Sequence, residues 1–262
     1  MNENHVRRNK IKQHGVKQGK PVNTVLLALF LSGLLSACNV FDGDSDDDDD
    51  VGQEQEQEQQ PQTNSFSVTV SNHTHNQPLS PIAVIIHDGG YSAWQFGGSA
   101  SEGLEMLAEG GDNALLLQEA DAVSMTVSGS GDSAFGPGEA STVELEVDTA
   151  FSELSLVTML VNTNDAFTGL NGVDLSGLAV GESLSRKLAV YDAGTEANSE
   201  AVGSIPGPAD GGEGFNALRD DLDKVARHPG IASIDGNNPD SALDQSHRFD
   251  APVATLTVTR TE

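Results

Sequence analysis

The sequence contains one cysteine, Cys38, so no disulfide bond can form within the chain. Basic residues are also few, with 13 lysines and arginines against 40 aspartates and glutamates. Six of the basic residues precede Cys38, and residues 38–262 therefore carry a formal charge of −32, from 7 basic and 39 acidic side chains. So negative a charge disfavours binding to nucleic acids and anionic lipid surfaces, and it favours the accumulation of divalent cations.

Signatures of several enzyme classes are missing. The sequence has no Gly-x-Ser-x-Gly motif, no phosphate-binding loop and no His-Glu-x-x-His motif. His73 and His75 could chelate a transition metal, but a third ligand is not near them in the sequence, and the pair is typical of a solvated turn. We therefore do not expect an enzyme. A hydrolase that uses paired carboxylates or a metal is the weakest of the alternatives.

The apolar run at residues 22–35 is too short and too interrupted for a comfortable membrane span. A basic segment precedes it and small residues follow it, which is the pattern of a secretory signal peptide. The run ends in Leu-Ser-Ala-Cys at residues 35–38, which resembles the lipobox of bacterial lipoproteins. We expect residues 1–37 to be a signal peptide and lipid on Cys38 to anchor the protein in the cell envelope. Asn39 favours the outer membrane, with the protein facing the periplasm or the exterior.

Residues 38–63 are predicted to be a disordered tether. They contain DGDSDDDDD at residues 42–50 and EQEQEQQ at residues 54–60, with no basic residue. Such composition cannot bury enough apolar surface to offset its ordering entropy. The alternating acids at its start suggest an EF-hand loop, but position six is Asp47 instead of Gly and position twelve is Gln53 instead of Glu.

Residues 64–262 are predicted to form one all-β domain. Apolar residues alternate with polar ones at Phe66, Val68 and Val70, and the same period recurs in several later segments. These segments are residues 123–127, 143–147, 188–190 and 256–258. Denser apolar runs at residues 81–87 and 154–161 suit central strands. Short strands separated by Gly, Pro, Asn and Asp clusters, without a βαβ rhythm, indicate an antiparallel β-sandwich.

One or two short helices are predicted in the connections between strands, and the sequence signals of one of them are clear. Ser99 and Glu102 match a capping box, Leu104 and Leu107 share an apolar face, and a Gly-Gly pair at residues 110–111 would end the helix. Residues 203–238 are rich in Gly, Pro, Asp and Asn, which predicts a long irregular excursion.

Two acidic clusters stand where strands run into loops. Asp165 follows the apolar run that ends at Val161, while Asp192 ends a later strand and Glu196 lies four residues beyond it. Loops at one end of a sandwich gather on one rim, so the three carboxylates could converge there, and calcium takes six to eight oxygen ligands of this kind. The alternative is that they are separately solvated loop acids, and spacing alone leaves both interpretations open.

The domain resembles the spondin N-terminal domain, the domain of F-spondin and mindin, in a bacterial lipoprotein form. Six stretches carry the resemblance, in the family's order and character. They are SPIAVIIHDGGYSAWQFGGSASEGLEMLAEGGD (80–112), LSLVTMLVNTNDAFTG (154–169), YDAGTE (191–196), SIPGP (204–208), HPG (228–230) and PVATLTVTR (252–260).

The resemblance implies a C2-like antiparallel β-sandwich with calcium at one edge, held by residues that correspond to Asp165, Asp192 and Glu196. Glu196 stands where the animal domains have aspartate, and the animal cysteines are absent here. Asn162, Asn164 and Asp174 are weaker candidates for an outer shell of the metal. His87, which recurs in the family's pattern, is expected to have a structural or rim-packing role.

The animal relatives act in adhesion and matrix contacts, so the resemblance implies a membrane-tethered recognition or adhesion module with calcium at the rim of the sandwich. Its expected partners are the membrane, through Cys38, and a glycan or protein at the rim. The alternative is a structural envelope lipoprotein without a specific ligand.

Overall fold

The computed structural model describes residues 62–123 and 125–262. The predicted signal peptide, the lipid site at Cys38 and almost all of the predicted tether lie outside these residues. No helix in the described part of the chain is long and apolar enough to cross a membrane.

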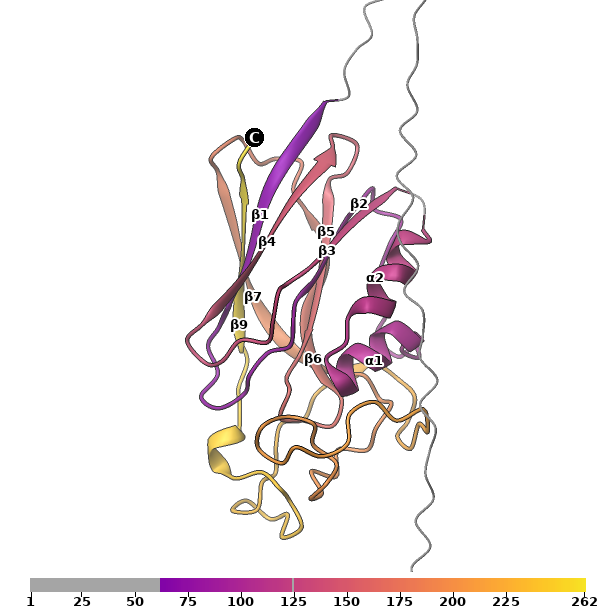
Figure 1. The fold of residues 1–262 in the computed structure, drawn as a ribbon, viewed down its shortest axis with the longest axis vertical. Helices are drawn as coiled ribbons and strands as arrows, with labels where there is room; N and C mark the ends of the chain where they lie inside the picture. The colour runs from indigo at the N-terminus through magenta and orange to yellow at the C-terminus, as the bar shows by residue number, and fades with distance from the viewer. Residues whose placement is uncertain (1–61, 124) are drawn as a thin grey trace, which may run out of the picture. The chain divides into compact units, whose positions relative to one another are not determined.

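The domain is an antiparallel β-sandwich, as predicted. Its strands are β1 (Thr63–Asn72), β2 (Ala83–His87), β3 (Thr126–Ser130), β4 (Ala140–Asp148), β5 (Glu153–Met159), β6 (Ala166–Asp174), β7 (Ser183–Asp192), β8 (Ala226–Arg227) and β9 (Ala254–Arg260). They are joined in the order β3-β2-β5-β6-β7-β9-β1-β4 (Figure 1), and the short β8 pairs with β7. All of these pairs are antiparallel.

Strand β7 links the two halves of the sandwich. Its first part, from Ser183 to Leu188, pairs with β9, and its last part, from Ala189 to Asp192, pairs with β6. The two ends of the strand order, β3 and β4, also approach each other, because Gly129 of β3 lies against Val143 of β4. The sheet is therefore nearly closed around one core.

The main core lies between the two halves and is built by the predicted alternation. Phe66, Val68 and Val70 of β1 are buried there with Leu154 and Leu156 of β5. The polar residues that alternate with these three apolar residues of β1 are only partly buried. Strand β5 is buried on both faces, which explains its nearly continuous apolar run.

Two helices, α1 (Glu102–Gly110) and α2 (Ala114–Asp121), cover the second face of the sheet and lie beside it in Figure 1. Helix α1 packs on β5 and β6, and α2 packs on β2 and β3. Leu104 and Leu107 of α1 pack in a cluster with Phe167 of β6. The predicted helix is confirmed, but its cap is Ser101, whose Oγ accepts a hydrogen bond from Leu104 N, and not Ser99.

The strand predicted at residues 123–127 begins later than its alternation suggested. Strand β3 starts at Thr126, because Val123 N donates to Ala120 O at the end of α2 and Met125 has a φ of +69°. A Met in that left-handed conformation breaks the extended backbone that the pattern requires.

The irregular excursion is confirmed. Between the end of β7 and the start of β9, the described chain forms only β8 and a short 3-10 helix, η1 (Gln245–His247). These loops, orange to yellow in Figure 1, gather at one end of the strands, and this end is called the rim below.

Gly169 should be indispensable to the β5–β6 pairing, because a Cβ at this position would collide with the carbonyl oxygen of Leu156. We expect Gly169→Ala to lower the free energy of unfolding by about 1–3 kcal/mol, the usual cost of overpacking. Gly177→Ala is the matched control, since a Cβ there has open space, and it should change stability by less than about 0.5 kcal/mol. Equal effects in urea unfolding would contradict this account.

Candidate functional site

The turn between β5 and β6 places Asp165 at the rim. Leu160 N donates to Ala166 O at 2.8 Å and closes the turn. The Thr163 hydroxyl supports it from inside, donating to Leu160 O at 2.6 Å and accepting from Ala166 N at 3.0 Å. Side chains that replace backbone partners in this way are the reason Thr and Asn are common in turns.

The carboxylate of Asp165 joins this turn to the loop after β7. Its Oδ2 accepts hydrogen bonds from Thr195 N at 2.9 Å, Glu196 N at 3.2 Å and the Thr195 hydroxyl at 3.3 Å. Its Oδ1 is buried and has no hydrogen-bond partner among the described residues. The two acidic loops predicted from the sequence therefore meet, and they leave one acceptor unsatisfied.

Asp192 shapes the second loop. Its Oδ1 accepts from Gly194 N at 2.7 Å, and its Oδ2 accepts from Asn198 Nδ2 at 2.5 Å. Gly194 has a φ of +69°, and a Cβ there would collide with the backbone of Lys224. Glycine is needed at this position both for its conformation and for the close approach of the neighbouring chain.

The electrostatics couple Asp165 to Asp192. Burial and the nearby charge of Asp192 together raise the pKa of Asp165 to about 7, although the hydrogen bonds from Thr195 and Glu196 oppose this rise. A buried carboxylate next to a second carboxylate favours either a proton or a bound cation. The structure thus brings these two predicted residues together.

The carboxylate of Glu196 is directed elsewhere. Its Oε1 accepts from Asn164 Nδ2 at 3.0 Å. Burial raises the pKa of Glu196 to about 7, opposed by that hydrogen bond and assisted by the charges of Glu109, Asp220 and Glu213. Glu196 therefore supports Asp165 through its backbone N–H, while its side chain belongs to a separate acidic group.

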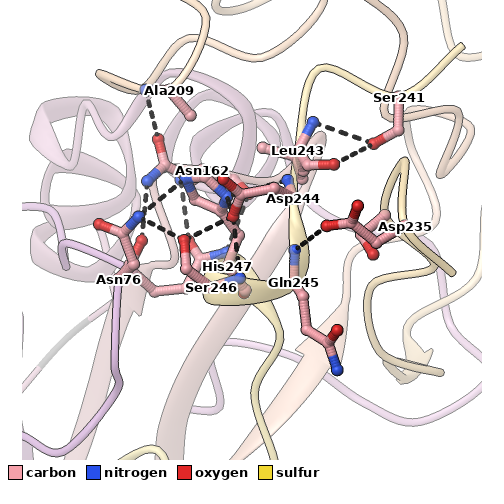
Figure 2. Close-up of polar contacts among 12 residues, drawn as sticks. Asn76, Asn162, Ala209, Asp235, Ser241, Leu243, Asp244, Gln245, Ser246 and His247 are labelled. Carbon is pink, nitrogen blue, oxygen red and sulfur yellow. Dashed lines mark hydrogen bonds and ion pairs between the residues drawn. The ribbon is translucent and has the colours of Figure 1, made fainter.

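The proposed outer-shell residues have other contacts. Asn162 ties three segments together: its Oδ1 accepts from Ala209 N, its Nδ2 donates to Asn76 O and its N–H donates to Gln77 Oε1 (Figure 2). Asn164 accepts from Glu200 N as well as donating to Glu196. Asp174 is exposed at the opposite end of β6, where Ser176 N donates to it, so it does not lie with the other candidates.

The fit to calcium rests on Asp165 and Asp192. The orphaned Oδ1 of Asp165 is the kind of acceptor that a hard cation satisfies, and carboxylate oxygen is the ligand type that calcium selects. Within residues 62–123 and 125–262, however, no group of three or more His, Cys, Asp or Glu side chains is arranged to hold a metal. The remaining ligands would have to be backbone carbonyls, water or a reoriented Glu196.

His87 has the contacts of a structural residue. It is fully buried, its Nδ1 accepts from Gly89 N at 3.1 Å, and its Nε2 lies 3.0 Å from the Ser155 hydroxyl. Burial lowers its pKa. The neutral ring thus fastens the turn after β2.

Two rim residues were not predicted from the sequence. Glu200 is buried with a φ of +54°, and its carboxylate accepts from Ala232 N, Ser233 N and the Ser241 hydroxyl, which fixes part of the excursion. Asn198 lies between Asp192 and His228, and its Oδ1 is 2.8 Å from His228 Nε2. Both residues lie in or next to the acidic loop. The sequence alone, however, does not distinguish a buried and hydrogen-bonded acid or amide from an exposed one.

Comparison with known families agrees with this architecture. A family model described as Spondin_N matches residues 56–203, more than half of the chain. The chain belongs to the Spondin_N family. No curated protein matches the sequence. Spondin_N membership supports a secreted or envelope recognition module, and because this is not an enzyme family it favours a non-enzymatic role.

The raised pKa of Asp165 predicts a pH dependence of stability in metal-free buffer. A carboxyl with a folded-state pKa of about 7 keeps a proton that the unfolded chain releases above its usual pKa of 3.8, so this group stabilises the fold as the pH falls from 7 towards 4. Asp165→Asn removes this response. As the pH is lowered from 7.5 to 5, the parent should therefore gain stability that the variant does not. The free energy of unfolding of the variant minus that of the parent should decrease by up to about 1.4 kcal/mol per pH unit.

Urea unfolding in EDTA at several pH values measures this difference. Asp174→Asn is the control, because its carboxylate is exposed and lies at the other end of β6. A difference between Asp165→Asn and the parent that stays constant with pH would show that Asp165 is ionised throughout.

Proposed function

We propose that this Spondin_N protein is a membrane-tethered recognition module of the bacterial cell envelope that binds calcium at the rim of its β-sandwich. Family membership supports the recognition role. The tether and the lipid anchor rest on the signal-like residues 1–37 and on Cys38. The calcium proposal is carried by one observation: the Oδ1 of Asp165, beside Asp192, is buried and has no hydrogen-bond partner in residues 62–123 and 125–262.

In this proposal, Asp165 and Asp192 supply the carboxylate ligands. A divalent cation would satisfy the orphaned oxygen and remove the repulsion that raises the pKa of Asp165. Glu196 is the third candidate, and its carboxylate would have to leave Asn164 to reach the ion. The cation would then brace the two loops that Asp165 already joins.

Calcium should raise the melting temperature of the purified protein. A ligand that binds only the native state stabilises it by about 2.7 kcal/mol at a free concentration 100 times the dissociation constant. We expect Asp192→Asn to lose most of this shift, because it removes a carboxylate from the site but keeps the side chain's size.

Two further variants define the site. Asp174→Asn, the same chemical change at the far end of β6, should keep the full calcium response. Glu196→Gln should lose part of the response only if that side chain turns towards the ion. If Asp192→Asn responds to calcium like the parent, the assignment to this rim fails, and loss of the response in Asp174→Asn would place the ion at the opposite end.

A recognition module and a purely structural envelope protein differ in their ligands. Arrays of glycans and proteins, probed with the purified protein in calcium and again in EDTA, should give hits that calcium strengthens, because the ion orders the loops that form the rim. Asp192→Asn serves as the matched probe. Stabilisation by calcium without any specific hit would favour the structural alternative.

A further inference from the structure

The few basic side chains of the folded region are unevenly placed. Residues 62–262 contain seven lysines and arginines. Three of them, Lys187, Arg227 and Arg248, line three neighbouring hollows beside β7 and β8, which share lining residues and are together called the groove below. In a domain of such negative charge, three cations along one groove form a local exception.

The groove consists of three neighbouring hollows. The first, of about 330 Å³, is lined by Lys187, Ala189, Arg227 and Pro252 among others, and the second, of about 190 Å³, shares Arg227 and Ala251 with it. The third, of about 280 Å³, contains Arg248 and shares Phe249 and Asp250 with the second.

These cations are not neutralised by described neighbours. Among residues 62–123 and 125–262, the ion pairs formed by basic side chains involve Arg219 and His247, and none involves Lys187, Arg227 or Arg248. Arg227 is held in another way, because its guanidinium lies 4.9 Å from the centre of the Tyr191 ring and 6.0 Å from that of Phe96. Such stacking fixes the position of the guanidinium and leaves its N–H donors available to a ligand.

The remaining lining suits a sugar more than a flat apolar ligand. Phe249 and Pro252 offer apolar faces, and His228 is already hydrogen-bonded through both ring nitrogens, to Asn198 and Gly230. Asp250 is the one acidic side chain that lines the hollows. Its carboxylate can accept hydrogen bonds from hydroxyl groups, and it repels any negative charge that a ligand places near it.

We propose that this groove binds an anionic oligosaccharide, a short glycan that carries carboxylate groups on successive or alternate rings. Three cations spaced along neighbouring hollows match a linear ligand with charges at intervals. Arginine also matches the planar geometry of a carboxylate. The inference rests on the proposed recognition role and gives its ligand class, but it does not require calcium.

A nucleic acid is the competing linear polyanion. It carries a charge on every nucleotide, and most of its binding energy comes from neutralising many phosphates with basic side chains. Three cations in a strongly acidic domain cannot supply such a surface, whereas they suffice for a few carboxylates. The observations therefore favour the glycan.

The groove also contacts the candidate calcium rim. His228 lines the second hollow, its Nε2 is 2.8 Å from Asn198 Oδ1, and Asn198 Nδ2 donates to Asp192. A ligand in the groove and a cation at Asp192 are thus separated by two side chains. Binding measurements with and without calcium therefore show whether the two sites influence each other.

The test uses the purified protein and trigalacturonic acid as the probe, with calorimetry at low ionic strength. We expect binding that Arg227→Gln and Lys187→Gln each weaken about tenfold, the effect of losing one charge-assisted contact. Arg186→Gln is the matched control. Arg186 directly precedes Lys187 on β7, so its side chain points to the opposite face of the strand, and it does not line the groove. It should change the affinity less than twofold.

Comparison with other ligands identifies the chemical group that the groove recognises. The methyl ester of trigalacturonic acid should bind at least tenfold more weakly, and glucose 6-phosphate and a short single-stranded oligonucleotide should bind more weakly than the uronate. Tighter binding of glucose 6-phosphate or of the oligonucleotide than of the uronate would overturn the assignment to a glycan carboxylate. The assignment would also fail if the uronate did not bind, or if the two groove variants and the Arg186→Gln control lost affinity equally. Uronate binding that persists in EDTA, while calcium fails to shift the melting temperature, would support the groove and reject the calcium proposal.

Discussion

The rim of this domain depends on one buried carboxylate. Asp165 lies in the turn before β6, and a single oxygen of its side chain accepts three hydrogen bonds from Thr195 and Glu196, thirty residues further along the chain. Burying a charge is costly unless it is hydrogen-bonded or neutralised, and only one of the two oxygens is satisfied by the described residues. The carboxylate that fixes the rim is therefore also a group that a proton or a cation would stabilise.

The same kind of contact orders the long excursion after β7. Glu200 holds residues 232, 233 and 241. Asn162 fastens Ala209 to the β5–β6 turn, and Gln77, in the segment after β1, donates to the carbonyl of His247 in η1. Strand pairing fixes backbone groups in both partners at once, whereas these loops are held by individual buried acceptors. A substitution that removes the carboxylate of Glu200 consequently leaves two backbone N–H groups unpaired, and loss of the side-chain oxygen of Asn162 or Gln77 leaves one.

The strands and the first helix follow from the sequence because period two and the Gly-Gly stop report directly on burial and backbone conformation. The late start of β3 does not, since Val123 continues the alternation but ends α2, and Met125 adopts a left-handed conformation. Loop positions predicted that Asp165 and Asp192 would meet. They could not predict that the carboxylate of Glu196 turns to Asn164, because a side chain's direction depends on neighbours that are distant in the sequence. Asp174 cannot belong to the same metal site as Asp165, because the two residues lie at opposite ends of β6, and a strand of nine residues is roughly 25–30 Å long.

The large negative charge and the basic groove are compatible because they act over different distances. At physiological ionic strength, charges further away than about 8 Å are largely screened, so the affinity of a bound anion depends on Lys187, Arg227, Arg248 and the nearby Asp250. A long polyanion also has to lie across the acidic surface outside the groove, and each additional charge then adds repulsion. The domain's overall charge thus excludes long polyanions, while the local cations remain available to a ligand no longer than the groove.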